Sequence, residues 1–147
     1  MIEAMKKTAL PAIRIAAALI TDEQGRLLLV RKAGTEWFMQ AGGKIEAGES
    51  ALSALRRELL EEINVNCSAD DKNFRYLGYF TAPAANEPEH VVEAEIYHIQ
   101  LQQSSITIGG EISEAIWVDP CEAKTLKLAP LTRIHVLPFA QTLKQNL

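Results

Sequence analysis

Residues 42–65 read GGKIEAGESALSALRRELLEEINV and combine a glycine pair, a helical pattern and clustered acids. Within this stretch, apolar side chains recur at spacings of three and four: Leu52, Leu55, Leu59 and Ile63. That spacing predicts an amphipathic helix over residues 50–63. Ser50 is suited to cap its start, and Asn64 can adopt the left-handed conformation that ends a helix.

Three acids lie in the last two turns of this predicted helix. Glu58, Glu61 and Glu62 are spaced by three and four residues, which places them on one face. The carbonyl end of a helix is negative, so each acid there costs about 0.3–1 kcal/mol. A solvated acidic face is the ordinary interpretation, but Arg57 can offset only part of this charge. Mg²⁺ and Mn²⁺ prefer such oxygen ligands, so the pattern indicates a divalent cation site.

The spacing of specified residues across this stretch is distinctive. It runs Gly43, five residues, Glu49, seven residues, then RELLEEINV over residues 57–65. This closely resembles the signature of the Nudix hydrolase family, and eight of the nine specified positions match. Asn64 stands where the family pattern has Gly, a mild departure because Asn tolerates the left-handed conformation.

The resemblance implies an α/β fold, an α/β/α sandwich around a mixed sheet. It implies one domain over residues 1–147, with the signature at 43–65. The rest of the chain agrees with a mixed sheet, because strand patterns and helices are interleaved irregularly. Strands are predicted over residues 13–21, 26–31, 74–81, 91–101 and 115–118, with the first two forming a hairpin. A final helix is predicted over 131–143, although Pro138 weakens it.

The resemblance also implies a metal centre. Its metal ligands would be Glu58, Glu61, Glu62 and the carbonyl of Gly43, and the ion would be Mg²⁺ or Mn²⁺. Arg57 and Glu49 would orient the cluster, with metal contact by Glu49 as an alternative. The chemistry implied is metal-assisted hydrolysis of a diphosphate linkage.

The general base has two candidates, Glu58 and the loop acid Glu111. Glu111 follows a glycine pair and lies six residues before Trp117, and it resembles the loop acid of MutT-type members. The alternative for Glu111 is a solvated loop acid. Lys32 and Lys44 match basic positions that contact substrate phosphates in such members, and the alternative is ordinary exposed lysines. Together with Arg57 and Glu61, these residues complete the candidate site.

The substrate implied is a nucleoside diphosphate linked to another group. Our leading expectation is a nucleoside triphosphate cleaved to the monophosphate and pyrophosphate, with an oxidised purine nucleotide as one option. Residues 128–133 lack the Asn with which the MutT protein reads its base, so base identity stays open. ADP-ribose or a nucleotide sugar is the nearest alternative. A non-catalytic, ligand-sensing Nudix-like module is an alternative of another class, which the retained acids disfavour.

Bulk composition limits the possible partners. The formal net charge of −4 disfavours nucleic acid as a partner, since that binding needs an excess of Lys and Arg. No apolar run is long enough for a bilayer, and no signal peptide is expected. Cys67 and Cys121 are expected to be free thiols in a reducing compartment, so we expect a cytoplasmic protein, as a monomer or homodimer.

Overall fold

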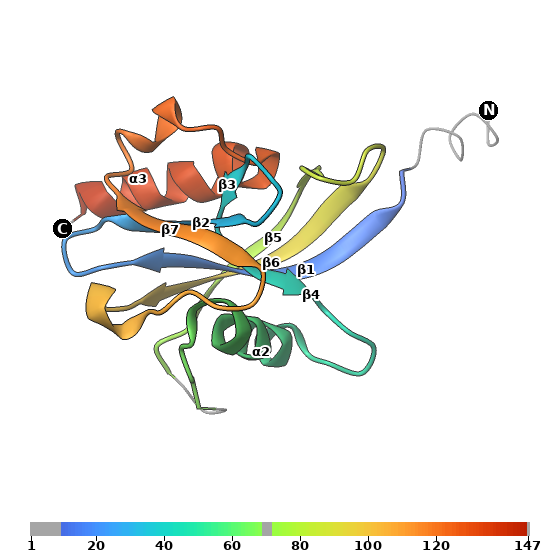
Figure 1. Cartoon of the computed structure of the whole chain (residues 1–147), viewed down its shortest axis with the longest axis horizontal. Helices are drawn as coiled ribbons and strands as arrows, with labels where there is room; N and C mark the ends of the chain where they lie inside the picture. The colour runs from blue at the N-terminus through green and yellow to red at the C-terminus, as the bar shows by residue number, and fades with distance from the viewer. Residues whose placement is uncertain (1–9, 69–71, 147) are drawn as a thin grey trace.

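A mixed β-sheet with a helix on each face forms the centre of the molecule (Figure 1). The computed structural model describes residues 10–68 and 72–146. Its strands are β1 (Ala12–Thr21), β2 (Leu27–Lys32), β3 (Phe38–Met39), β4 (Ala41–Lys44), β5 (Arg75–Pro83), β6 (Val91–Gln100) and β7 (Ile112–Val118). The sheet runs β3-β2-β1-β6-β5, with β4 paired to β1 and β7 to β2. The helices are α2 (Ala51–Ile63) and α3 (Leu137–Gln145), with a π-helix (Thr132–Val136) before α3 and short 3₁₀ turns at Gln103–Ser105 and Ala123–Thr125.

Strand β1 divides the core into two layers. Ala16, Ala18 and Ile20 belong to a cluster that also contains Leu55, Leu59 and Ile63 of α2. Ala17 and Leu19 face a second cluster that includes residues of α3. Successive side chains of a strand point to opposite faces, so a central strand covered on both sides reads as one continuous apolar run. This arrangement confirms the predicted α/β/α fold.

Pairing with β1 explains one departure from expectation. The predicted hairpin between the first two strands closes at one residue pair, Thr21 with Leu27. Beyond that pair, β1 is hydrogen-bonded to β6 in parallel and to β4 in antiparallel orientation. Strand β2 therefore pairs along its length with β7 instead.

The predicted C-terminal helix is present in two parts. The π-helix covers Thr132–Val136, and α3 follows from Leu137. Pro138 lies in the first turn of α3, where its missing N–H breaks no helical hydrogen bond. Among all the residues that the structure describes, no helix is long and apolar enough to cross a membrane.

Both predicted caps of α2 are confirmed. The Ser50 hydroxyl accepts a hydrogen bond from the Ser53 amide at 3.1 Å. Asn64 has φ 58° and ψ 33°, and its amide donates to the Leu59 carbonyl. These caps fix where the helix begins and ends, and they therefore fix which face the acidic residues occupy.

The turn after β1 predicts a pH-dependent contribution to stability. Asp22 is 5% exposed, and it accepts hydrogen bonds from Gln103 and from the Arg26 side chain and amide. Burial raises the pKa of Asp22, but the hydrogen bonds together lower it by more, so the pKa lies below the usual 3.8. A carboxylate whose pKa is lower in the folded state stabilises the protein at pH values above its unfolded-state pKa. This stabilisation is lost as the pH falls through the folded-state pKa.

We therefore expect Asp22→Asn to lower the free energy of unfolding at pH 7 by about 2 kcal/mol, the scale of hydrogen bonds to a charged group. The difference from the parent should narrow as pH falls below 3.8. Urea unfolding at several pH values measures this difference in the free energy of unfolding. A difference that stays constant down to acid pH would contradict the stabilising role of the Asp22 carboxylate.

Candidate functional site

The glycine pair of β4 lies beside the second half of α2, at Glu58 and Glu62. Gly42 has φ 141°, and a Cβ there would lie 2.2 Å from the Ala16 carbonyl oxygen, so only glycine fits. A Cβ on Gly43 would lie 2.4 Å from the carboxyl carbon of Glu58. The absence of a side chain at Gly43 therefore leaves room for the Glu58 carboxylate beside the strand.

Arg57 joins the loop before α2 to the acids of the helix. Its Nε and Nη2 donate to the two oxygens of Glu49 at 2.9 and 2.8 Å. Its Nη1 donates to Glu58 at 2.8 Å, and its Nη2 donates to the Lys44 carbonyl at 3.0 Å. Hydrogen bonds from Arg57 and from the Glu46 amide lower the pKa of Glu49 to about 2. These contacts suit the orienting role predicted for Arg57 and Glu49, which stays a prediction.

Glu62 is the buried acid of the cluster, with 5% exposure. Its Oε1 accepts a hydrogen bond from the Gly42 amide at 3.1 Å. Burial raises the pKa of Glu62 to about 7, the Gly42 amide opposes this rise, and the charge of Glu58 adds to it. The charged form of this carboxylate is thus disfavoured by its surroundings, and a neighbouring divalent cation would favour it.

Glu61 is the exposed acid of this cluster. Its side chain is 55% exposed, and it lies 3.7 Å from Nη1 of Arg57. As the side chains stand in the described residues, no three acidic, His or Cys groups converge on a common point. The structure thus brings Glu58 and Glu62 to the glycine pair and leaves Glu61 at the surface beside them.

The donor set nonetheless fits a hard cation. Two carboxylates and a glycine backbone lie together, and the third carboxylate is on the same helix face, one turn from Glu58. Oxygen donors of this kind suit Mg²⁺ and Mn²⁺. Metal binding by these residues stays a prediction.

The loop that carries Glu111 docks on the carbonyl end of α2. The Thr107 amide donates to the Ile63 carbonyl at 3.0 Å, and the Gly109 amide donates to the Glu62 carbonyl at 2.9 Å. Glu111 itself is exposed. Sequence reasoning missed these contacts, although the unpaired carbonyls of a helix end were the available signal. The loop reaches the acidic end of the helix, and the role of Glu111 as a base stays a prediction.

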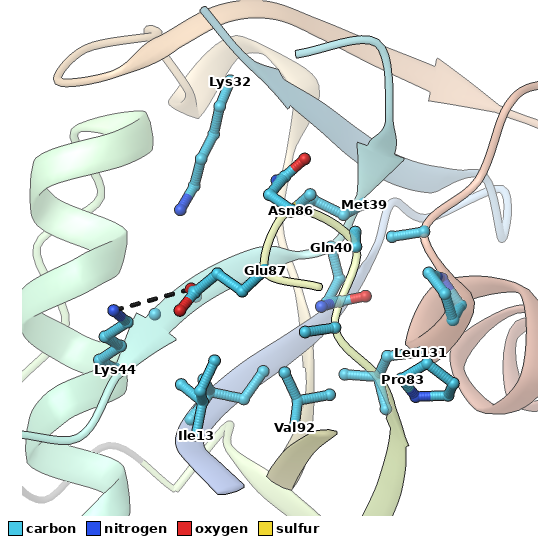
Figure 2. A pocket seen from close by; sticks show the side chains of 17 residues that line it. Ile13, Lys32, Met39, Gln40, Lys44, Pro83, Asn86, Glu87, Val92 and Leu131 are labelled. Carbon is cyan, nitrogen blue, oxygen red and sulfur yellow. Dashed lines mark ion pairs between the residues drawn. The ribbon is translucent and has the colours of Figure 1, made fainter. Parts of the chain in front are cut away.

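A pocket opens beside the glycine pair, and both predicted lysines line it (Figure 2). Nζ of Lys44 lies 3.8 Å from a carboxylate oxygen of Glu87, which belongs to the loop after β5. Lys32 comes from the end of β2. The structure brings the two lysines to one cavity, and phosphate binding by them stays a prediction.

Further lining residues were not predicted from the sequence, although residues 128–133 had been related to base recognition. They come from β1, from the segment around β3, from the loop after β5, and from the segment before the π-helix, and they include Ile13, Met39, Gln40, Asn86 and Leu131. Because these segments lie far apart in the chain, local spacing gave no signal for them.

Comparison with known proteins identifies the architecture. The NUDIX domain model matches residues 11–138. The chain belongs to the NUDIX domain family. This Nudix domain resembles the E. coli ORF135 protein with a TM-score of 0.69 and 25% identity, over 93% of this chain and 94% of that one. It also resembles E. coli dihydroneopterin triphosphate pyrophosphohydrolase with a TM-score of 0.72 and 16% identity, over 88% and 95% of the two chains.

Two curated relatives match more locally. The Nudix domain is 30% identical over 120 residues to m7GpppN-mRNA hydrolase NUDT17 of Danio rerio, which covers 70% of this chain and 40% of that protein. It is 40% identical over 57 residues to 8-oxo-dGTP diphosphatase of Haemophilus influenzae, which covers 36% of this chain and 42% of that protein. The chain thus spans less than half the length of both relatives.

The family resemblance predicted from residues 43–65 is therefore confirmed. The relatives also support the prediction that the Nudix domain is a hydrolase. The names of these two relatives differ in substrate.

Proposed function

We propose that this Nudix domain hydrolyses a nucleoside triphosphate to the monophosphate and pyrophosphate, assisted by a divalent cation. The main support for this proposal is the cluster of charged side chains beside Gly42 and Gly43. There, Glu58 lies over Gly43, Glu62 accepts from Gly42, and Arg57 links Glu58 to Glu49. A pocket with two lysines adjoins this group. The relative named 8-oxo-dGTP diphosphatase supports a triphosphate, and an oxidised purine nucleotide is the more specific option.

The cation would be held by Glu58, Glu61, Glu62 and the carbonyl of Gly43, with Glu49 as an additional ligand in the alternative arrangement. Mg²⁺ or Mn²⁺ fits this set of oxygen donors. When bound, such an ion neutralises phosphate charge and makes a bound water more acidic.

The chain's own side chains would divide the remaining work. Arg57 holds Glu58 in position through the hydrogen bond at 2.8 Å. Lys32 and Lys44 would bind substrate phosphates, and Lys44 would exchange its contact with Glu87 for a phosphate oxygen. Glu58 or Glu111 would accept the proton of the attacking water. The water oxygen then bonds to the α- or the β-phosphorus, the P–O bond to the oxygen that bridges these two breaks, and the monophosphate and pyrophosphate separate.

A substrate panel tests this proposal. Nucleoside triphosphates including 8-oxo-dGTP, ADP-ribose, a nucleotide sugar and a capped RNA would be incubated with Mg²⁺ or Mn²⁺ and scored for phosphate products. We expect cleavage of a triphosphate to the monophosphate and pyrophosphate, abolished by a chelator. Capped RNA belongs in the panel because one relative is an mRNA hydrolase.

Other outcomes would redirect the assignment. Preferred cleavage of ADP-ribose, a nucleotide sugar or capped RNA would contradict the triphosphate proposal and name the substrate class. Failure to cleave any compound would favour the ligand-sensing alternative. The same proposal includes a cytoplasmic location and a single domain over residues 1–147. It also includes a monomeric or homodimeric state and no nucleic acid as a partner.

A further inference from the structure

A buried polar pair lies at one wall of the pocket. Gln40, between β3 and β4, is 7% exposed and lines the cavity. Thr132, the first residue of the π-helix, is fully buried, and its hydroxyl donates to Oε1 of Gln40 at 2.7 Å. Buried polar groups are costly unless paired, so this hydrogen bond holds the Gln40 side chain in place.

The hydrogen bond gives the Gln40 amide a direction. A glutamine amide has an accepting oxygen at one end and a donating NH₂ group at the other. Thr132 lies outside the cavity and occupies the oxygen, since its buried hydroxyl proton needs an acceptor. The nitrogen is then the end presented to the pocket, and Figure 2 shows the Gln40 amide projecting among the lining residues.

The rest of this pocket wall suits the faces of a ring. Ile13, Met39, Val92 and Leu131 supply apolar side chains around the Gln40 amide (Figure 2). In a largely apolar pocket, the few placed polar groups decide which ligand is accepted. Asn86, the other amide that lines the pocket, is exposed, so the buried Gln40 is the more rigidly held donor.

We propose that Gln40, oriented by Thr132, determines base specificity by donating a hydrogen bond to a carbonyl group of the base. The pocket would therefore accept keto bases, such as guanine, hypoxanthine and uracil, over amino bases, such as adenine and cytosine. An amino group at the same position would place its own N–H donors against the N–H donors of Gln40, so no hydrogen bond could form. This inference rests on the proposed function, because it assumes that the pocket receives the base of a nucleotide.

Two matched substrate pairs test the assignment. Inosine and adenosine triphosphates, and uridine and cytidine triphosphates, differ at the carbonyl or amino group that Gln40 would read. The parent should prefer the keto member by about ten- to hundredfold in kcat/KM, the scale of leaving buried donors unpaired.

Three variants probe the same contact. Gln40→Glu presents an acceptor and should invert the ratio. Thr132→Val removes the hydroxyl that orients the amide and should bring the ratio toward one. Thr132→Ser keeps the hydroxyl and should keep the preference. Thermal unfolding of each variant confirms that the ratios come from folded protein, and ratios unchanged in both Gln40→Glu and Thr132→Val would overturn the inference.

Binding separates failure of this inference from failure of the proposed function. Calorimetry would compare inosine and adenosine monophosphates, which need no turnover. If triphosphates are cleaved without a preference that depends on Gln40, this inference falls and the proposed function stands. If nothing is cleaved but the monophosphates bind with a preference inverted by Gln40→Glu, the inference stands and the proposed function falls. Equal affinity of the parent for both monophosphates, or no binding of either, would overturn the inference.

Discussion

Glu61→Gln is expected to lower kcat by about a thousandfold while leaving the free energy of unfolding within about 0.5 kcal/mol of the parent. The stabilisation that a metal ligand set supplies is worth several kcal/mol, and each 1.36 kcal/mol changes the rate tenfold. The side chain is 55% exposed, so the folded protein should tolerate the change. Steady-state kinetics with Mg²⁺, together with urea unfolding, measures both quantities.

The chain offers a matched control at Glu46. Its carboxylate lies 3.9 Å from Arg57 and is 70% exposed, much as the Glu61 carboxylate lies 3.7 Å from the same guanidinium. Glu46→Gln removes a similar charge near Arg57 but lies outside the acidic face of α2. We expect it to keep kcat within about twofold of the parent, because only a surface ion pair is lost. Equal losses in the two variants would show that Glu61 acts only through Arg57, against a role as a metal ligand.

Gly42→Ala is expected to destabilise the protein by on the order of 3 kcal/mol or more, a large share of the total stability of a domain. Its Cβ would lie 2.2 Å from the Ala16 carbonyl oxygen and 2.8 Å from the Ala17 Cα, both in the central strand. The φ of 141° adds strain for any residue with a side chain. Loss of the cooperative urea transition, or a sharply lower midpoint, is the expected result.

Gly43→Ala separates folding from function at the next residue. The three heavy atoms nearest to its Cβ would all belong to the carboxylate of Glu58, which is the far end of a flexible side chain and can move. We expect a stability change below about 1 kcal/mol, typical of sites away from a packed core, together with loss of turnover because Glu58 is displaced. Parental turnover in Gly43→Ala would contradict the role of Glu58, and a parental urea midpoint in Gly42→Ala would contradict the pairing of β4 with β1.

The helix and its acids were predictable because their signals are local. The apolar stripe, Ser50 and Asn64 specify α2 within 15 residues, and the caps occur as expected. The same local spacing places Glu58, Glu61 and Glu62 on one face. Their different surroundings were not predictable, since Glu62 is buried and accepts a hydrogen bond from Gly42 of β4, whereas Glu61 is exposed.

Contacts between distant segments account for most of the remainder. The pairing of β2 with β7 depends on which strands take the edges of β1, a choice made by the whole sheet. Gln40 and Thr132 are 92 residues apart in the chain, and their hydrogen bond depends on the π-helix before Pro138. The spacing of apolar or charged residues within one segment carries no information about a contact of this kind.

The central claim is that the acidic end of α2 binds a divalent cation for hydrolysis. A crystal structure of the protein grown with excess Mn²⁺, read through anomalous scattering, locates any ion directly. We predict an ion in contact with Glu58, Glu61 and Glu62 and with the Gly43 carbonyl oxygen. Well-ordered carboxylates with no ion between them, under those conditions, would contradict the account.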